Sequence, residues 1–236
     1  AYDICACLVG SEMCIRDRAL HKVFDSPYDK IVFDVGHQSY AHKLSTGRLA
    51  DFDSLRQKDG ISGFLKPKES IHDPVVSGHS STSISAALGI AQAMKLSGDK
   101  HHAIAVIGDG ALTGGMAYEA LNNAASLKSN FIIVLNDNEM SITENVGGMS
   151  SYLSGLRTAS AYTGFKMDVT KALNRIPGIG PGMVDAMRKT KSSIKQIIIP
   201  GMLFEDMGLI YIGPVNGHNA VSYTHLRAHE TCADLV

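Results

Sequence analysis

One loop of the sequence holds an acidic residue between two glycines, Gly108-Asp109-Gly110, and continues through Ala111 to Gly114-Gly115. A glycine-rich turn from a strand into a helix lets backbone N–H groups approach a phosphate, and the start of the helix favours negative charge. Two familiar phosphate loops are excluded, because the dinucleotide fingerprint needs glycine at Thr113 and the P-loop needs lysine at Met116. A tight turn with Asp109 as a helix cap is the purely structural alternative.

A second polar loop follows the next apolar stretch and reads Asn136-Asp137-Asn138-Glu139-Met140. Side-chain oxygens of Asp109 and Asn138, at the ends of adjacent strands, could meet on one cation. Mg²⁺ takes oxygen ligands, usually one or two carboxylates together with phosphate oxygens. One Asp, one Asn and one backbone carbonyl therefore fit a magnesium ion that also binds a diphosphate. The spacing, with 27 residues between Gly110 and Asn138, resembles the thiamine-diphosphate signature of the transketolase superfamily.

These loops need strands to position them. Three short apolar runs predict buried strands, at Lys30–Val35, Ala103–Ile107 and Phe131–Leu135. Apolar runs without polar alternation are typical of parallel sheets that are covered on both faces. Ligands of such sheets bind outside the carboxyl ends of the strands, which is where both polar loops begin.

Helical patterns lie between and after these strands. We expect one helix at Ser83–Leu96, stopped by Gly98, a second at Met116–Leu127 and a third at Pro181–Ile199, with a fourth strand at Leu209–Ile212. The inner stripe of the second helix is expected to hold four apolar residues: Met116, Ala120, Ala124 and Leu127. This alternation predicts an α/β fold with a doubly wound, mostly parallel sheet.

The composition narrows the class of protein. The chain has 236 residues, of which 44% are hydrophobic and 19% charged, enough for a large domain with a real core. A formal net charge of −1 excludes a strongly basic nucleic-acid-binding protein, so no nucleic acid is expected as a partner. No apolar run approaches the roughly 20 residues that cross a bilayer, so no membrane contact is expected either.

The four cysteines are confined to the two ends of the chain: Cys5, Cys7, Cys14 and Cys232. Residues 1–18 show neither helical nor strand periodicity, and residues 221–236 gather His225, His229 and Cys232 in a spacing that matches no zinc pattern. Both ends are similar to translated sequencing-adapter text. We interpret residues 1–18 and 221–236 as non-native tails and residues 19–220 as the domain, which is of a reduced, cytosolic type.

The sequence stretches around the two polar loops are more specific to one family than the loops themselves. The chain reads FDVGHQSYAHK at 33–43, SGHSSTSISAALGIAQAMKLSGDK at 77–100, VIGDGALTGGMAYEALNNA at 106–125, LNDNEMSITENVG at 135–147 and YIGPVNGHN at 211–219. Together these stretches resemble the amino-terminal part of the 1-deoxy-D-xylulose-5-phosphate synthase family, thiamine diphosphate enzymes related to transketolase. The resemblance runs over residues 19–220.

The resemblance implies a set of site residues. Mg²⁺ would be bound by Asp109, Asn138 and the backbone carbonyl of Met140. The cofactor would be contacted by seven residues: His37, Gly78, His79, Ser80, Gly110, Ala111 and Asn138. His79 and His37 would be the catalytic candidates, since an imidazole can shuttle protons in carbanion chemistry and can donate to a phosphate when charged. A hydrogen-bonded structural histidine is the alternative for His37.

The resemblance also implies a reaction, the condensation of pyruvate with glyceraldehyde 3-phosphate to 1-deoxy-D-xylulose 5-phosphate with loss of CO2. The family works as homodimers in the bacterial cytoplasm and needs a second domain, so this chain is expected to be an incomplete, inactive fragment. Two alternatives stay open at this point. The chain could be a fragment of another transketolase-family enzyme, which the wording at 136–147 argues against, or a non-catalytic cofactor-binding module.

Overall fold

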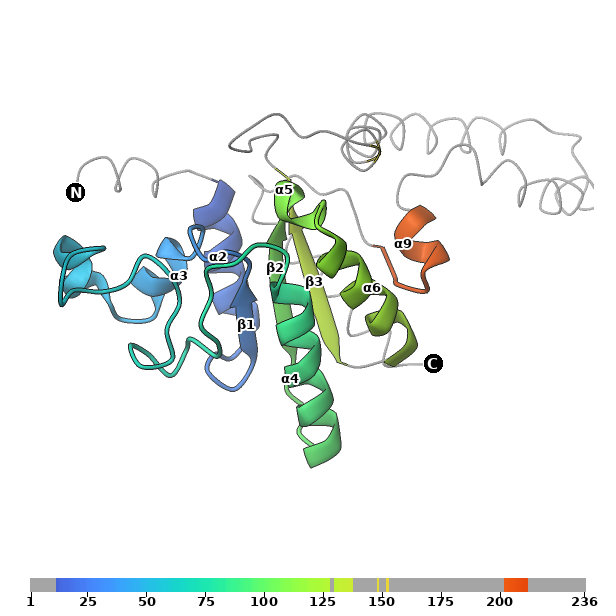
Figure 1. Ribbon diagram of the computed structural model, residues 1–236. Helices are drawn as coiled ribbons and strands as arrows, with labels where there is room; N and C mark the ends of the chain where they lie inside the picture. Colours follow the sequence, from blue (N-terminus) through green and yellow to red (C-terminus); the bar gives the residue numbers. More distant parts are fainter. Residues whose placement is uncertain (1–11, 128–129, 138–147, 149–151, 153–201, 212–236) are drawn as a thin grey trace, which may run out of the picture. The chain divides into compact units, whose positions relative to one another are not determined.

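The computed structural model describes residues 12–127, 130–137, 148, 152 and 202–211. The chain divides into two compact units, one formed by Ala1–Asn145 with Val215–Val236 and the other by Val146–Pro214. Nearly all the described residues belong to the first unit, which holds a three-stranded sheet and its helices (Figure 1).

The sheet consists of β1 (Lys30–Phe33), β2 (Ala103–Gly108) and β3 (Phe131–Asn136) in the order β1-β2-β3. Both pairings are parallel, with Lys30 beside Ala103 and Ala103 beside Phe131. The three predicted strands are therefore confirmed to within two residues at their ends, and so is their parallel arrangement. All three strands consequently end at the same edge of the sheet, which places the following loops together.

Both faces of the central strand are covered. Residues Ala103–Ile107 of β2 are all buried, although successive side chains of a strand point to opposite faces. One cluster packs Leu20 of helix α2 (Glu12–Val23) against side chains of the first two strands, namely Ile31, Phe33, Ile104 and Val106. The expectation of burial on both faces is confirmed for β2 and for most of β1, whereas residues 131–135 of β3 are only partly buried.

Helix α4 (Ser83–Ser97) packs against β1 and β2 and also against helix α6 (Gly115–Leu127). These two helices lie in front of the sheet in Figure 1. The predicted stop of α4 is confirmed, because Gly98 has φ +74° and its N–H bonds to Lys95 O and Met94 O.

The expected inner stripe of α6 is half wrong. Met116 and Leu127 are 46% and 39% exposed, and the buried stripe is instead formed by Ala117, Ala120, Leu121 and Ala124. The helix is therefore rotated from the expected position about its own axis. Small side chains allow α4 and α6, both rich in alanine, to pack closely.

Four shorter helices in the described part of the chain connect or follow these elements. Helix α3 (Tyr40–Ser45) and the 3-10 helix η1 (Leu49–Ser54) lie between β1 and α4, and the one-turn helix α5 (Asp109–Leu112) joins β2 to α6. In the second unit, α9 (Met202–Asp206) is the described helix, and Phe204 stacks on Tyr211 with ring centroids 5.7 Å apart.

Two further sequence expectations are wrong and one lies outside the described residues. Residues 12–18 were expected to lack helical structure, yet they form the first turns of α2. Leu209–Tyr211, expected to begin a fourth strand, form no strand. The helix expected at Pro181–Ile199 lies outside the described residues.

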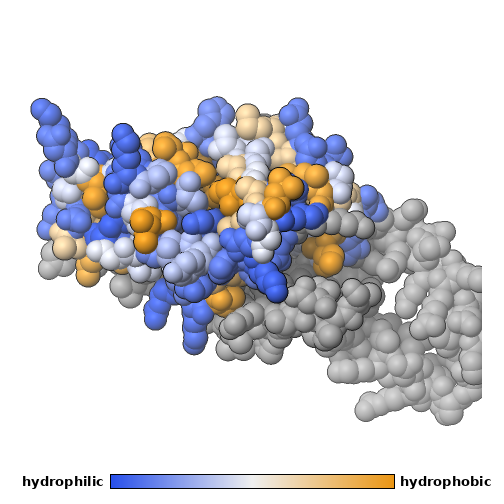
Figure 2. Space-filling model, turned by 90° about the horizontal axis from the view of Figure 1, so that it is seen from below, coloured by the Kyte–Doolittle hydropathy of each residue, from blue (hydrophilic) through white to orange (hydrophobic). Residues whose placement is uncertain are grey.

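The described part of the chain holds no helix that is long and apolar enough to cross a membrane. Seen from the amino ends of the strands, its surface is mainly hydrophilic, and the hydrophobic residues on it are separated by hydrophilic ones (Figure 2).

Candidate functional site

The carboxyl edge of the sheet gathers three segments that the sequence singled out. Residues 34–39 follow β1, residues 109–111 follow β2, and residues 77–82 lead into α4. Helix α5 lies at this edge, where β2 ends (Figure 1). Because β1 and β2 are parallel neighbours, their following loops begin side by side.

The turn after β1 is tight and has an unusual backbone. Val35 has φ +58° and Gly36 has φ +101°, and a β-branched residue at positive φ is a genuine outlier. A Cβ on Gly36 would collide with the side chain of Ser77, so glycine lets residues 34–39 approach residues 77–82 closely. Such local strain is maintained only where surrounding contacts hold it in place.

His37 follows this turn and is exposed. Partial desolvation of its ring lowers the pKa of His37, the positive charge of Arg56 lowers it further, and the carboxylate of Asp34 opposes both effects. The ring is therefore biased toward its neutral form, which can accept a proton.

Both oxygens of Asp34 bind backbone N–H groups at the start of α4. Oδ1 accepts from Ser81 N at 2.8 Å and Oδ2 accepts from Ser83 N at 2.9 Å. The N-cap residue Thr82 makes no side-chain capping bond of its own. Asp34, which is only 4% exposed, thus takes the capping role for a helix that begins 49 residues later.

Ser81 connects this arrangement to the loop after β2. Its hydroxyl donates to Ala111 O at 2.6 Å, and its backbone has φ +67°. A Cβ on Gly114 would collide with the Ser81 side chain, so the second glycine pair of the loop leaves room for this bond. The three segments are therefore linked by hydrogen bonds from β1 to α4 and from there to α5.

His79 lies in the same segment as Ser81 and is exposed, as are Gly78 and Ser80. Its Nδ1 is 2.7 Å from Ser80 O. A carbonyl oxygen only accepts, so Nδ1 carries the hydrogen in this bond, and Nε2 of the neutral ring is left with its lone pair. The second nitrogen of His79 can therefore act as a proton acceptor.

The predicted metal ligands are only partly within the described residues. Asp109 is the first residue of α5 and is 4% exposed, whereas Gly110 and Ala111 are partly exposed. Asn138 and Met140 lie outside the described residues, so their convergence with Asp109 stays a prediction. Within the described part of the chain, no cluster of three His, Cys, Asp or Glu side chains is placed to hold a metal ion.

One further polar group at this edge suits a bound ligand. Asn136 ends β3, is 5% exposed, and its Nδ2 has no hydrogen-bond partner within the described structure. Its own backbone oxygen faces the open side of Gly108, where the Gln38 side chain also lies. A buried amide donor without an acceptor, beside a glycine, is compatible with a site built for a polar cofactor.

Sequence reasoning missed three residues of this edge: Asp34, Ser81 and Asn136. A weak signal existed for Asp34 and Asn136, because each is a polar residue directly after an apolar run. Ser81 carried no signal, since its role depends on a backbone conformation and on a partner 30 residues away.

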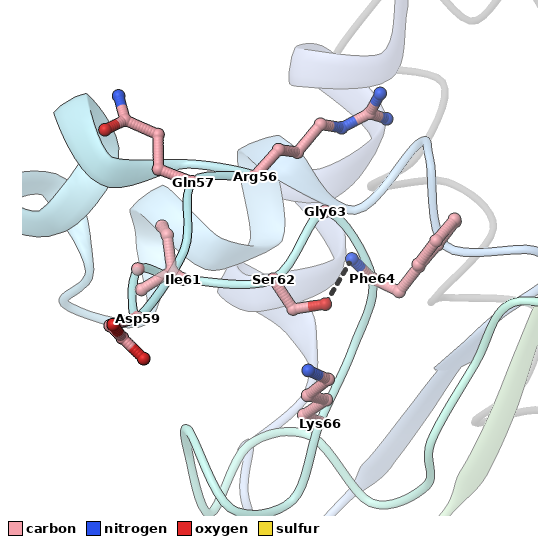
Figure 3. Close-up of a pocket in the computed structure, with 9 residues that line it drawn as sticks. Arg56, Gln57, Asp59, Ile61, Ser62, Gly63, Phe64 and Lys66 are labelled. Carbon is pink, nitrogen blue, oxygen red and sulfur yellow. Dashed lines mark hydrogen bonds between the residues drawn. The ribbon is translucent and has the colours of Figure 1, made fainter.

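A surface hollow of about 490 Å³ lies along residues 56–66 (Figure 3). Its lining includes Arg56, Ser62 and Lys66, and it contains none of the residues predicted from the sequence to bind the cofactor. Ser62 Oγ accepts from Phe64 N at 3.2 Å within it. Two features connect this hollow to the candidate site: the charge of Arg56 acts on His37, and the ring of Phe64 lies beside Gly36.

Solved structures of transketolase are similar to part of the chain. A transketolase R525L mutant from Pichia stipitis aligns with a TM-score of 0.49 and 23% identity, covering 59% of this chain and 26% of that one. A second transketolase structure from the same organism, of H66 mutants with xylulose 5-phosphate, aligns with the same TM-score and 22% identity.

Sequence comparisons give a closer likeness. The chain is 59% identical over 204 residues to a 1-deoxy-D-xylulose-5-phosphate synthase of Desulfitobacterium hafniense, covering 86% of this chain and 32% of the relative. Synthases of Caldanaerobacter subterraneus and Pelotomaculum thermopropionicum are 58% identical over 201 residues and 56% identical over 210 residues, covering 85% and 89% of this chain. The chain spans about a third of the length of these relatives.

A family model described as 1-deoxy-D-xylulose-5-phosphate synthase matches residues 6–231, which is most of the chain. The match includes all three segments that meet at the carboxyl edge of the sheet. The chain therefore belongs to the 1-deoxy-D-xylulose-5-phosphate synthase family.

Proposed function

We propose that this chain is the thiamine-diphosphate-binding part of an enzyme that condenses pyruvate with glyceraldehyde 3-phosphate to 1-deoxy-D-xylulose 5-phosphate, with release of CO2. The observation that carries the proposal is the 59% identity to a protein named as this synthase, over 204 residues that include the carboxyl-edge loops. The proposal assigns residues 19–220 to the native domain and residues 1–18 and 221–236 to non-native tails.

The residues at the carboxyl edge suit a diphosphate cofactor with its metal. Asp109 would bind Mg²⁺ together with Asn138 and the carbonyl of Met140, and Gly110 and Ala111 would present backbone amides to the diphosphate. The unpartnered Nδ2 of Asn136 supports the fit, because a cofactor at this edge can supply the missing acceptor. When bound, thiamine diphosphate supplies the nucleophilic carbon of the reaction.

The two histidines are assigned proton transfer. His79 Nε2 is left free to accept a proton, because Nδ1 is used in the bond to Ser80 O. His37 has a lowered pKa and is therefore neutral near pH 7, which suits an acceptor or a neutral donor to the cofactor. Gly78 and Ser80, which flank His79, would complete the contact to the cofactor.

We further propose that the complete enzyme is a homodimer of the bacterial cytoplasm and that the 236-residue chain alone gives no turnover. The small fraction of the relatives that the chain covers supports the second point, since about two thirds of their length is absent from the match. Pyruvate and glyceraldehyde 3-phosphate are the small-molecule partners in this proposal.

A graft tests the activity. Residues 19–220 would replace the aligned segment of the Desulfitobacterium hafniense protein, and product formation from pyruvate and glyceraldehyde 3-phosphate would be measured. We expect an active chimera that loses activity on Asp109→Ala. A folded chimera without product, beside an active parent protein, contradicts the proposal.

Calorimetry on the 236-residue chain tests the cofactor site directly. We expect weak binding of thiamine diphosphate that needs Mg²⁺ and is abolished by Asp109→Ala, since a carboxylate ligand is lost. Binding that is unchanged by chelation of Mg²⁺ and by the substitution would remove the metal assignment.

A further inference from the structure

Asp34 does more than cap the amino end of α4. Asp34 lies at the carboxyl end of β1, three residues before His37, and its N–H donates to Val106 O at 2.8 Å, continuing the β1–β2 pairing. Its position is thereby fixed by the sheet. Its two carboxylate oxygens then fix the backbone of Ser81 and Ser83.

We propose that Asp34 is a positioning residue of the cofactor site, which sets the segment of Gly78, His79 and Ser80 in register with the loop after β2. The inference deepens the proposed function and rests on it. Asp34 would act through Ser81, whose backbone N–H it binds, and not by its own contact with cofactor or substrate.

The backbone of Ser81 needs an outside partner. A φ of +67° is unfavourable for serine, so this conformation needs a partner that maintains it. Asp34 Oδ1 supplies that partner through the 2.8 Å bond from Ser81 N. A carboxylate bond to a backbone N–H is stronger than a neutral one, which suits this task.

Ser81 in turn binds the loop after β2. Its hydroxyl is aimed at Ala111 O, the carbonyl of a residue proposed to present its amide to the diphosphate. Thr82, on the other side of Ser81, donates from its hydroxyl to His79 O at 3.0 Å. Ser81 is therefore bonded to the loop after β2, while its neighbour is bonded to the histidine of its own segment.

The amino end of β1 offers a comparison residue, Asp29. Asp29 immediately precedes β1, is 6% exposed and also accepts two backbone N–H bonds, from Asp25 at 2.7 Å and from His102 at 2.7 Å. Asp29 and Asp34 are therefore alike in burial and in accepting two backbone N–H bonds, but they lie at opposite ends of one strand, and Asp29 Oδ1 also lies 3.3 Å from His102 Nδ1. If Asp34→Asn and Asp29→Asn differ in their effect on cofactor binding, the difference arises from the position of Asp34 near the candidate site.

The test compares Asp34→Asn with Asp29→Asn in the 236-residue chain. Each amide loses one acceptor and sets an NH2 group against a backbone N–H, so both variants should lower stability. Only Asp34→Asn should speed hydrogen exchange at Ser81 and Ser83, and only this variant should lower the pKa of His37, because Asp34 raises it. Both readouts are taken by NMR on the free chain.

Binding of thiamine diphosphate with Mg²⁺ is then measured by calorimetry. Loss of an outer group that orients a site weakens binding by about 10- to 100-fold, and we expect at least the lower figure for Asp34→Asn and less than about threefold for Asp29→Asn. Ser81→Ala, which removes the bond to Ala111 O, should reproduce most of the loss.

The outcomes separate the two proposals. Equal exchange rates at Ser81 and Ser83 in both aspartate variants, or equal cofactor affinity in both, overturns the positioning role of Asp34. A wild-type chain that shows no cofactor binding, while the grafted synthase is also inactive, overturns the proposed function. In that case the exchange rates still decide whether Asp34 holds the segment of residues 77–83.

Discussion

Arg16 and Asp17 are consecutive residues of helix α2 and both are fully buried, with Arg16 Nε donating to Asp17 Oδ1 over 2.7 Å. Arg16 also donates to Gln38 and lies over the ring of Phe33. The other carboxylate oxygen of Asp17 has no hydrogen-bond partner in the described structure. Burial raises the pKa of Asp17 even though the Arg16 charge opposes the effect. A buried ion pair that lacks part of its hydrogen bonds lowers the stability of the fold, because its desolvation is not fully compensated.

We therefore expect the double variant Arg16→Met, Asp17→Val to stabilise the fold by about 1–4 kcal/mol, as when a buried ion pair is replaced by apolar residues. Asp17→Val alone leaves the guanidinium buried with fewer partners and should destabilise by about 3 kcal/mol. Urea unfolding followed by circular dichroism measures both changes. A double variant less stable than wild type would contradict the prediction, since it would mean that the ion pair is a net contribution to stability.

A second buried ion pair is built differently. Asp73 is 1% exposed and accepts from Arg48 at 2.7 and 2.8 Å, from His42 Nε2 at 3.2 Å and from Lys66 N at 3.0 Å. Burial acts to raise the pKa of Asp73, but the hydrogen bonds from His42 and Arg48 outweigh it, so the pKa lies well below its usual value. Four groups donate to the Asp73 carboxylate, so its hydrogen-bonding capacity is better satisfied than that of Asp17.

Asp73→Ala should therefore destabilise the fold by about 3–5 kcal/mol, because it leaves the Arg48 charge buried without its partner. The contribution of Asp73 is present above the ordinary aspartate pKa of 3.8 and is lost as the pH falls below it. Urea unfolding near neutral pH and in acid measures both effects. The exposed Asp51 offers a control, and equal losses for Asp51→Ala and Asp73→Ala would contradict the prediction.

The titration of His21 makes the stability of the fold depend on pH, in a range closer to neutrality than that of Asp73. Its Nε2 is 2.8 Å from His42 Nδ1, and the two rings stack with centroids 4.9 Å apart. Burial lowers the pKa of His21 from 6.5 to about 4, with the nearby His42 and His72 adding to the effect. Between these values the unfolded chain binds a proton that the folded chain does not.

The stability that depends on neutral His21 is complete above pH 6.5 and is lost as the pH falls from 6.5 to about 4. Since the ring is partly exposed, we expect a loss of about 1–2 kcal/mol over this range. The measurement compares the free energy of unfolding of wild type and His21→Gln across the range. The variant should lose less stability than wild type, and parallel curves would show that His21 is not the titrating group.

The strands and the main helices could be predicted because each is a continuous local pattern. Ala103–Gly108 is an apolar run, and Ser83–Ser97 is a helical pattern with a glycine stop. The start of α2 was missed because Arg16 and Asp17 interrupt its apolar face, and charged residues are rarely buried. The rotation of α6 was missed because a hydrophobic pattern favours the larger Met116 and Leu127, whereas the buried stripe consists mostly of alanine.

The candidate site could be predicted only where residues adjacent in sequence form it. The loop from Asp109 to Ala111 and the segment from Gly78 to Ser80 carry their own signals, and the structure brings both to the carboxyl edge through Ser81. The bonds of Asp34 join residues 47 and 49 positions apart, and no local pattern encodes such a pair. Long-range backbone capping was therefore beyond the reach of motifs and periodicity.

The hollow at residues 56–66 contributes the charge of Arg56 to the candidate site. Desolvation is the main cause of the lowered pKa of His37, and the positive charge of Arg56 is the next. Arg56→Gln removes that charge, so the pKa of His37 should rise toward its ordinary value. Lys66→Gln is the matched control, because Lys66 lines the same hollow but is not among the charges that act on His37. NMR titration of the His37 ring measures both variants. An unchanged pKa in Arg56→Gln, or an equal rise in Lys66→Gln, would show that Arg56 does not set the protonation of this histidine.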